Sequence, residues 1–560
     1  MPDAGLRTPP PLAPDIVRVI PLGGLGDVGR NMTSLEVNGR LLLIDCGVLF
    51  PEDDHPGVDL ILPGLEAIAD RLDDVEALVL THGHEDHIGA VPYLLRQRGD
   101  IPVLGSRLTL GFLNEKLREH RLRRVQLRTV TDGERVSLGP FDLEFVAVNH
   151  SIPDAMAVFV RTAGGTVLHT GDFKMDQLPL DGRITDLRSF ARLGTEGVDL
   201  FLVDSTNAEV PGFTLPEQDV EPALERVFEQ SRQKLVVACF ASHVHRVQQV
   251  LDLAVQHGRK VVYVGRSMVR NMSVARDLGY LRVPSDTLIE LADLKTYAED
   301  EVVIISTGSQ GEPLSALSRM ANRAHPHVEL RAGDTVLLAS SLIPGNENSV
   351  YRVINGLAKI GARVVHKGNA LVHVSGHASA GELLYAYNIV QPRNVMPVHG
   401  EIRHLIANAN LAIATGVPQE RTIVVEDGSV VDLAGGVAKV VGRVDAGYIL
   451  VDGASVGGLT EESLADRKIL GSEGFITVVA AINLHAQRLT SLDIHARGFV
   501  ADDGVFDEVR QQIIDDLRGA LADGVDDQYR LQQIMRRTLG RWVSSTHRRR
   551  PMILPVVVAT

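Results

Sequence analysis

Cysteine is almost absent from this chain, with Cys46 and Cys239 as the only two among 560 residues. A disulfide-stabilised scaffold is therefore excluded, and so is a metal site built from thiolates. Aromatic residues are also few, at 4% of the sequence, which argues against an extended platform for stacking bases. Any metal site in this chain must use imidazole and carboxylate ligands.

Long hydrophobic runs are missing as well. No run of about 18 apolar residues occurs, so we expect no membrane-spanning segment and no membrane partner. The N-terminal segment 1–16 is rich in proline and lacks the apolar core of a signal peptide. We therefore expect a disordered tail at this end and a cytoplasmic protein.

Positive charge is in deficit, since 56 Lys and Arg stand against 71 Asp and Glu, for a net charge of -15. At first sight this argues against a nucleic-acid partner, because phosphate binding usually leaves a basic footprint. Two stretches depart from the average. Residues 105–135 contain eight basic and four acidic residues, and residues 530–560 contain seven arginines and no acid. Both are candidate contacts to nucleic acid, along a backbone-binding groove.

The chain is organised as alternating apolar runs and helical patterns. At roughly 100–200 residues per domain, its length suggests about two to four domains. Short β-branched runs that end in polar clusters predict an α/β fold, with a purely parallel pattern in the middle of the chain. We divide the chain into a tail at 1–16, a first α/β part at 17–217, an inserted α/β domain at 218–370, the second part of the first domain at 371–450, a linker at 451–465 and a C-terminal α+β domain at 466–560.

The densest chemical signal is the heptapeptide THGHEDH at 81–87, directly after the apolar strand 76–80. His82 and His84 are two residues apart in an extended loop, so both can point the same way. Asp86 and His87 lie at the start of the next predicted helix and can face a second ion. Imidazole and carboxylate groups at this density are typical of a site for zinc or a similar divalent ion.

Four further candidate ligands each follow a predicted strand. In open α/β sheets, functional sites form beyond the carboxyl ends of the strands. One such residue alone would more often be a structural cap, but four of them beside the heptapeptide indicate a common site. They are His150, Asp172, Asp204 and His399.

A glycine-rich segment near the N-terminus imitates a dinucleotide-binding motif. Gly24, Gly26 and Gly29 fit G-x-G-x-x-G, and Asp45 follows about 20 residues later. However, the Asn38-Gly39 pair predicts a hairpin where that motif requires a helix. We expect a tight turn near the site instead.

Together, the heptapeptide, His150 and Asp172 resemble the metallo-β-lactamase fold, an αββα sandwich. The resemblance implies two divalent ions, zinc in the first place and manganese as an alternative. His82, His84 and His150 would hold one ion, Asp86, His87 and His399 the other, and Asp172 would bridge them. Two ions about 3.5–4 Å apart suit the hydrolysis of a phosphodiester.

The stretch between Asp204 and His399 resembles the inserted domain of the β-CASP group, which processes nucleic acids. Asp204 matches its first motif, His377 in HVSGHAS its second, and His399 its third, where a histidine favours RNA over DNA. From residue 17 onward the chain resembles the bacterial ribonuclease J family, in its actinobacterial form. The segments that carry this resemblance are GGLGDVGRNM, DCGVLFPEDDHPGVDLILP, GRSMVRN, TGSQGEPLSALSRMA, SSLIPGNE, HVSGHASAGELL and PMILPVVV.

The resemblance implies metal-assisted hydrolysis of single-stranded RNA in RNA maturation and mRNA decay. We expect a 5′→3′ exonuclease that prefers 5′-monophosphate ends, together with endonuclease activity and a 5′-phosphate product. His377 is the expected general acid, Asp204 would hold its ring, and Asp86 completes the catalytic set. His243 stands where many relatives have asparagine. The expected substrate-binding residues are Ser242, His243, Val244, Arg266, Ser267, His373, Val374, Ser375, Gly376 and His377.

Two other functions remain as alternatives. A single-stranded DNA nuclease of DNA repair is disfavoured by His399, and a non-catalytic RNA-binding scaffold is disfavoured by the complete ligand set. Small-molecule hydrolases with the same fold lack the inserted domain. The resemblance also suggests a homodimer or homotetramer formed through the C-terminal domain, and partners in an RNA-degrading complex.

Overall fold

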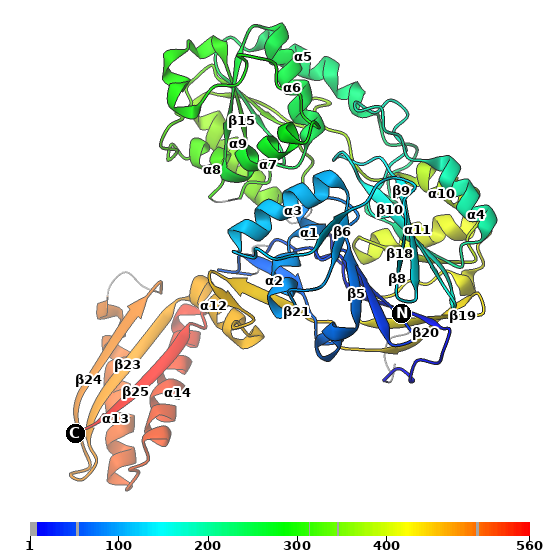
Figure 1. The fold of residues 1–560 in the computed structure, drawn as a ribbon. Coiled ribbons are helices and arrows are strands. Elements are labelled where there is room, and N and C mark those ends of the chain that lie inside the picture. Colours follow the sequence, from blue (N-terminus) through cyan, green and yellow to red (C-terminus); the bar gives the residue numbers. More distant parts are fainter. Residues whose placement is uncertain (1–7, 52–54, 313, 344–345, 500–502) are drawn as a thin grey trace. The chain divides into compact units, whose positions relative to one another are not determined.

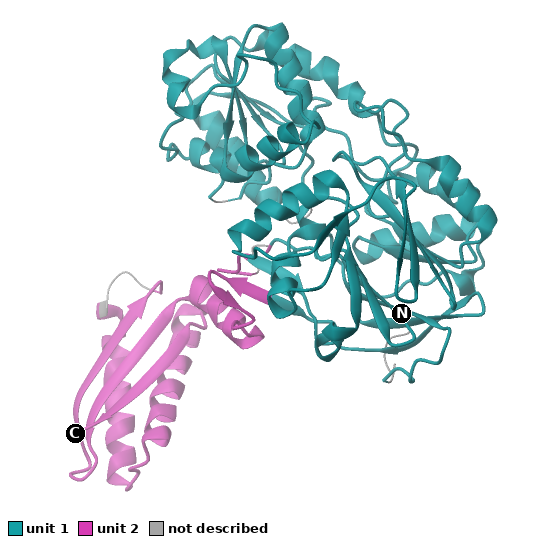
Figure 2. Cartoon of the chain, in the orientation of Figure 1, with its two compact units in different colours: residues 1–50, 60–449 teal, residues 51–59, 450–560 magenta. Residues whose placement is uncertain are grey.

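The computed structural model describes residues 8–51, 55–312, 314–343, 346–499 and 503–560. The chain forms two compact units, shown in Figure 2. The first comprises residues 1–50 and 60–449, and the second comprises residues 51–59 and 450–560. Among the described residues, no helix is long and apolar enough to cross a membrane.

The first unit contains two mixed sheets that pack face to face. The larger sheet has eight strands in the order β20-β19-β1-β2-β3-β5-β6-β7. Its strands are β1 (Val17–Gly23), β2 (Met32–Val37), β3 (Arg40–Ile44), β5 (Val75–Val79), β6 (Val103–Gly105), β7 (Leu127–Thr129), β19 (Ser429–Ala434) and β20 (Val437–Arg443). The predicted hairpin at Asn38-Gly39 is confirmed, because both residues adopt positive φ and join β2 to β3.

The second sheet has six strands in the order β18-β12-β11-β10-β9-β8. Its strands are β8 (Arg135–Leu138), β9 (Phe141–Ala147), β10 (Met156–Thr162), β11 (Gly165–His169), β12 (Leu200–Asp204) and β18 (Asn394–Val398). Apolar side chains of both sheets, such as Leu42, Val79 and Phe145, form a shared buried core between them. The short strand β4 (Leu60–Pro63) also belongs to this unit.

Helices complete the four-layer arrangement seen in Figure 1. Phe159 and Phe201 on the outer face of the second sheet pack against Phe190, Leu383 and Ala412, on three covering helices. These are α4 (Leu187–Glu196), α10 (Ala380–Val390) and α11 (Ile402–Ala414). On the side of the larger sheet lie α1 (Glu85–Ile88), α2 (Val91–Gln97) and α3 (Arg107–Glu119), of which α3 contacts β6.

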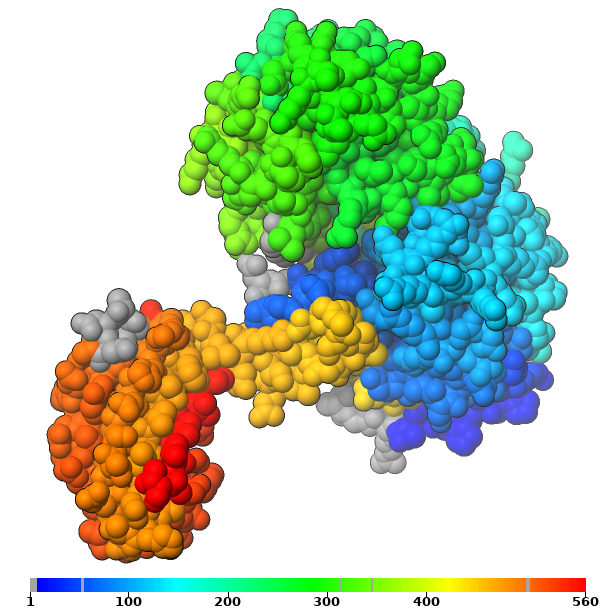
Figure 3. Space-filling view, turned by 60° about the vertical axis from the view of Figure 1, so that its left-hand side comes forward, coloured from blue at the N-terminus to red at the C-terminus, as the bar shows by residue number. Residues whose placement is uncertain are grey.

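Between β12 and β18 the chain forms a separate parallel sheet in the order β14-β15-β13-β16-β17. Its strands are β13 (Leu235–Ala238), β14 (Lys260–Val264), β15 (Val302–Ser306), β16 (Thr335–Leu338) and β17 (Arg363–Val365). The associated helices are α5 (Glu221–Gln230), α6 (Val244–Gln256), α7 (Arg266–Asp277), α8 (Ala316–Ala321) and α9 (Glu347–Ile360). This part, which we call the parallel domain, is the green body of the space-filling view in Figure 3.

The second unit is built on a three-stranded sheet covered by helices. Strands β23 (Phe475–Asn483), β24 (Arg488–Arg497) and β25 (Met552–Ala559) have the order β24-β23-β25. The predicted closing strand at the C-terminus is thus confirmed as β25, which pairs with β23 in parallel. Apolar residues of α13 (Asp507–Ala522) and α14 (Gln528–His547) cover one face of this sheet.

The remaining elements are short, apart from one helix. They are β21 (Tyr448–Asp452), β22 (Ser455–Val456), α12 (Glu461–Glu473), and the 3₁₀ helices η1 (Ala69–Asp74), η2 (Glu217–Val220), η3 (Leu291–Thr296), η4 (Glu299–Glu301), η5 (Gln419–Arg421) and η6 (Asp503–Phe506).

Candidate metal centre

The structure brings the seven candidate ligands together at the carboxyl ends of their strands. His82, His84, His150 and Asp172 have ligand atoms within 4.8 Å of one another. The same holds for a second set, whose members are Asp86, His87, Asp172 and His399. Both sets therefore have the number and type of donors that a divalent ion requires.

Asp172 is shared by the two sets. Its Oδ2 lies 3.5 Å from His82 Nε2 and 3.7 Å from His150 Nε2 in the first set. The same oxygen lies 3.2 Å from His87 Nε2 in the second set. Its other oxygen, Oδ1, lies 2.7 Å from His399 Nδ1. This carboxylate is thus placed between both sets of candidate ligands.

In the first set, three ring nitrogens face one another, and they cannot all be joined by N–H···N hydrogen bonds. His84 Nδ1 lies 3.1 Å from both His82 Nε2 and His150 Nε2. His150 Nδ1 donates to the carbonyl of Gly376 at 2.6 Å, so the neutral His150 ring presents a lone pair from Nε2. Converging lone pairs are the donor arrangement of a metal site, so these residues fit a divalent ion.

Burial keeps the first three imidazoles neutral. It lowers the pKa of His82 and of His150 well below their usual range, with a further contribution from neighbouring histidines. Burial likewise lowers the pKa of His84 to about 4. Because only the neutral ring can bind a metal, these three side chains are in the ligand state at neutral pH.

The second set contains two carboxylates instead of one, and the pKa values of its histidines shift in the opposite direction. Burial alone would lower the pKa of His87, but Asp172, Asp86 and Asp45 raise it well above its usual range. In the same way, burial alone would lower the pKa of His399, but Asp172, with further contributions from Asp86 and Asp204, raises it to about 10. This pair of imidazoles lies in a strongly negative field, which favours a bound cation.

Asp45 is a part of this centre that the sequence did not identify. Its Oδ2 lies 2.8 Å from His87 Nδ1, and both of its oxygens accept hydrogen bonds at 2.8 Å from Thr81. A carboxylate on the distal ring nitrogen orients a ligand histidine. The signal in the sequence is its place directly after strand β3, but the spacing from the glycines presents Asp45 as the acid of a dinucleotide motif. The glycines of that motif are followed by strand β2 instead of a helix.

His377 lies beside the candidate ligands and contacts Asp204. His377 Nδ1 is 2.8 Å from Asp204 Oδ2, and its ring centroid is 5.0 Å from that of His150. Burial alone would lower the pKa of His377, but Asp204 raises it above the usual value. The His377 side chain keeps 19% of its surface exposed, whereas that of Asp204 keeps 1%. The contact with Asp204 therefore favours the protonated form of this partly exposed imidazole.

The loop that carries His377 is held by groups that the sequence did not reveal. Glu382 is fully buried, and its carboxylate accepts from the amides of Met175, Thr214 and Ser379 at 2.7–2.8 Å. The hydroxyl of Thr214 donates to the carbonyl of His377 at 2.8 Å. Only the capping box formed by Ser379 and Glu382 could have been read from the sequence.

The expected phosphate-binding residues lie on both sides of the connection to the parallel domain. Ser242, Ser267 and Ser375 are partly exposed, and Arg266 is exposed. By contrast, His243, Val244, His373 and Val374 are buried, with the rings of His243 and His373 5.9 Å apart. Gly376 directs its carbonyl to His150, and a Cβ there would lie 2.6 Å from that ring. Helix α6 begins next to His243 without a side-chain cap. The amide of Val244 donates to the carbonyl of Ser242 at 2.8 Å, whereas the amides of His245 and Arg246 have no backbone partner among the described residues.

Comparison with known proteins defines the class of this molecule. Residues 25–197 match the metallo-beta-lactamase superfamily, and residues 361–424 match a Zn-dependent metallo-hydrolase RNA specificity domain. Residues 232–357 match the beta-CASP domain of ribonuclease J, and residues 462–560 match the ribonuclease J C-terminal domain. The fold is thus that of a metallo-β-lactamase-type hydrolase with a β-CASP insertion, as the sequence predicted.

Full-length relatives define the family. The chain is 52% identical over 556 residues to ribonuclease J of Mycolicibacterium smegmatis, covering 99% of both chains. It is 53% identical over 557 residues to ribonuclease J of Mycobacterium tuberculosis, covering 99% of this chain and 100% of that one. This chain belongs to the ribonuclease J family. A solved structure of a protein of unknown function from Enterococcus faecalis has a similar fold, with a TM-score of 0.53 and 15% identity over 75% of this chain and 100% of that one.

Proposed function

We propose that this metal-dependent ribonuclease degrades single-stranded RNA from its 5′ end, prefers 5′-monophosphate ends and also cuts internally. The observation that carries the proposal is the position of Asp172, shared between two sets of candidate ligands, beside the His377–Asp204 pair. Imidazole and carboxylate donors are suited to zinc, and manganese can also use them. Bound there, two divalent ions would supply a hydroxide nucleophile at neutral pH and neutralise charge on the phosphate.

The protein's own groups account for the departure of the leaving group. His377, whose protonated form is favoured by its contact with Asp204, donates its proton to the 3′ oxygen of the departing nucleotide. Asp204 keeps the ring oriented, because Nδ1 is engaged and the other nitrogen is left to face the substrate. The phosphodiester oxygen thereby leaves on the sugar 3′ side, and the product carries a 5′-phosphate.

Groups around the loop at 373–377 support a subsite for a 5′-monophosphate. The uncapped start of α6, where the amides of His245 and Arg246 have no backbone partner among the described residues, favours an anion, and the partly exposed hydroxyls of Ser242 and Ser375 can donate to it. Arg266 is exposed at the start of α7 and adds a positive charge. Such a subsite selects a single phosphate at the RNA terminus.

RNA outside the active site binds to basic side chains at the end of α3. In residues 105–135, Lys116, Arg118, Arg128 and Arg135 each pair with a carboxylate. Arg121, Arg123 and Arg124 are exposed and remain free for phosphates in the part of the chain that the structure describes. Lys116 pairs with Glu85 and Phe112 packs on Gly83, so α3 leads from this stretch to the metal-binding loop.

The biological setting of the proposal follows the family resemblance. It includes RNA maturation and mRNA decay in the cytoplasm, assembly as a homodimer or homotetramer through the C-terminal domain, and partners in an RNA-degrading complex.

The proposal is tested by digestion of 5′-monophosphate and 5′-triphosphate RNA of one sequence, beside single-stranded DNA of the same sequence. With zinc or manganese present, the monophosphate RNA should be degraded fastest and the DNA should survive. Equal cutting of RNA and DNA, or no cutting of any substrate, would overturn the proposal.

A further inference from the structure

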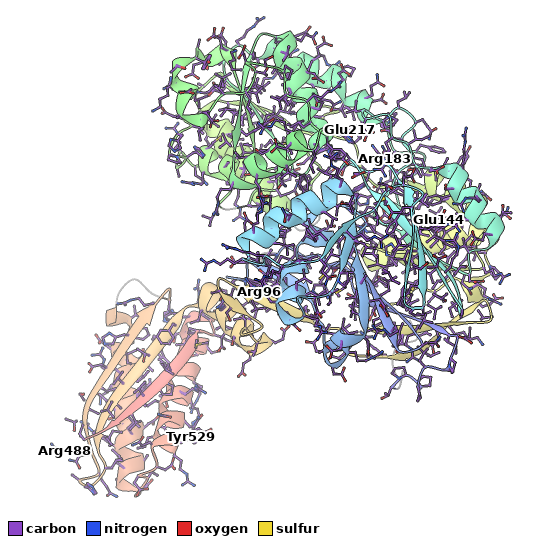
Figure 4. All side chains as sticks on the ribbon, viewed as in Figure 1. Arg96, Glu144, Arg183, Glu217, Arg488 and Tyr529 are labelled. Carbon is purple, nitrogen blue, oxygen red and sulfur yellow. The ribbon has the colours of Figure 1, made fainter. Side chains whose placement is uncertain are left out.

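Four charged side chains are buried where the chain passes between the metal centre and the parallel domain. Lys174 and Asp176 follow strand β11, Glu217 lies in η2 on the outgoing connection, and Arg246 lies on α6. Their exposed fractions are only 0–3%. Figure 4 labels Glu217 beside this connection. We call these four residues the buried junction.

Glu217 is the central member of the buried junction. Its Oε1 forms an ion pair with Arg246 and lies 3.3 Å from His243 Nε2. Its amide donates to Asp176 at 2.8 Å, and its Oε2 lies 3.9 Å from Lys174 Nζ. One carboxylate thus contacts the residue that precedes α6, the helix itself and the segment that follows Asp172.

Arg246 links Glu217 to the segment by which the chain returns from the parallel domain. Its guanidinium donates to the carbonyl of Val372, one residue before His373. Its Nε donates to Gln249 at 2.9 Å, and Gln249 donates to the carbonyl of Glu217 at 3.2 Å. The ion pair of Glu217 and Arg246 therefore holds both connections to the parallel domain, the outgoing one at Glu217 and the returning one at Val372.

The buried junction leaves several buried polar atoms without hydrogen bonds, so it is not arranged for maximum stability. Lys174 Nζ, Glu217 Oε2 and His373 Nδ1 are buried without a hydrogen-bond partner among the described residues. A buried ion pair often contributes no more stability than apolar side chains of similar size, but it does define geometry. Here the ion pair fixes the positions of His243 and of the loop at 373–377.

We propose that Glu217 is a positioning residue that holds both sides of the 5′-monophosphate subsite, at His243 and at the loop 373–377, in register with the metal centre. This inference rests on the proposed function, because it assigns the part of the molecule that creates the preference for a 5′ end. Glu217 acts through His243 and Arg246 and does not touch RNA.

The test compares Glu217→Gln with wild type on RNA that carries either a 5′-monophosphate or a 5′-hydroxyl. Glu217→Gln should raise KM for the monophosphate RNA roughly 10- to 100-fold, the scale of a small misplacement of binding groups. The kcat on both RNAs and KM for the hydroxyl RNA should stay unchanged. Glu229→Gln, on the exposed side of α5, is the matched control and should behave as wild type.

A second variant separates positioning from folding. Glu217→Gln/Arg246→Met removes both charges of the pair, so it should keep a thermal midpoint close to that of wild type and still lose the monophosphate preference. Two results would overturn the inference: equal loss on both RNAs in this variant, or full retention of the preference in either variant. Lack of a monophosphate preference in the wild type would instead contradict the proposed function.

Discussion

The carboxylate of Asp45 lies 2.8 Å from Nδ1 of His87, which leaves His87 Nε2 to face Asp172 at 3.2 Å. Asp45 and His399 are both non-glycine residues in the left-handed region, with φ of 60° and 55°. Such backbone strain persists where the surroundings hold it in place, often at functional sites. The contact therefore identifies Asp45 as a group that orients the second set of candidate ligands.

Replacement of Asp45 by asparagine should weaken metal binding. The variant loses the carboxylate that orients His87, and metal affinity should fall roughly 10- to 100-fold. Metal content after competition with a graded chelator measures this change. Asp100→Asn, on an exposed turn, is the control and should bind metal as wild type does. Unchanged affinity in Asp45→Asn would contradict the role of Asp45.

Replacement of His377 by alanine should abolish turnover but not metal binding. Loss of a general acid lowers kcat by about 10²- to 10⁴-fold. Single-turnover hydrolysis of 5′-monophosphate RNA, with metal content measured on the same samples, gives the result. His327→Ala, in an exposed loop of the parallel domain, should have no effect. Full turnover of His377→Ala with normal metal content would remove His377 from the mechanism.

Removal of two charges beside α3 should weaken RNA binding. Arg123→Gln/Arg124→Gln should raise Kd severalfold and reduce the slope of log Kd against log salt by about 1 to 2, because phosphate contacts release counterions. Titrations with labelled single-stranded RNA at several salt concentrations measure both quantities. The double variant Arg548→Gln/Arg549→Gln serves as comparison, and a larger effect there would place the RNA contact in the second unit.

The stability of the buried junction should depend on pH in a defined direction. Burial would raise the pKa of Glu217, but Arg246, His243 and Lys174 together hold it well below its usual range. Because the folded pKa is depressed, its stabilisation is present above the unfolded pKa of about 4.3 and is lost as pH falls through the folded value. Because Glu217→Gln leaves its charged partners unpaired, it should lower the free energy of unfolding by about 3–5 kcal/mol at neutral pH.

Thermal unfolding of wild type and Glu217→Gln as a function of pH tests this prediction. The gap between their midpoints should be largest near neutral pH and should shrink as the pH falls below about 5. A gap that stays constant or widens toward low pH would contradict it.

Much of the site could be predicted from the sequence, because strand ends and ligand chemistry are both local signals. His150, Asp172 and His399 each follow a recognisable apolar strand within one to three residues, and the ends of neighbouring strands meet at one edge of a sheet. The order of the strands in the two sheets and the pairing of the sheets depend on long-range contacts, which local patterns do not encode.

The supporting contacts could not be predicted for the same reason. Arg246 lies in a helix and would ordinarily be assigned to the surface, yet it is fully buried against Glu217, 29 residues earlier in the chain. Glu382 resembles an ordinary capping residue, and its bonds to Met175 and Thr214 span more than 160 residues. Such contacts arise only once the two connections to the parallel domain lie side by side.

The most direct test of the account measures metal content and RNA hydrolysis on the same samples. Wild type should bind two divalent ions per chain, lose all hydrolysis of 5′-monophosphate RNA on chelation and regain it with zinc or manganese. Asp172→Asn, which alters the residue shared by both ligand sets, should lose metal and activity together. Hydrolysis that persists in metal-free protein, or an Asp172→Asn variant with full metal content and full activity, would contradict the account.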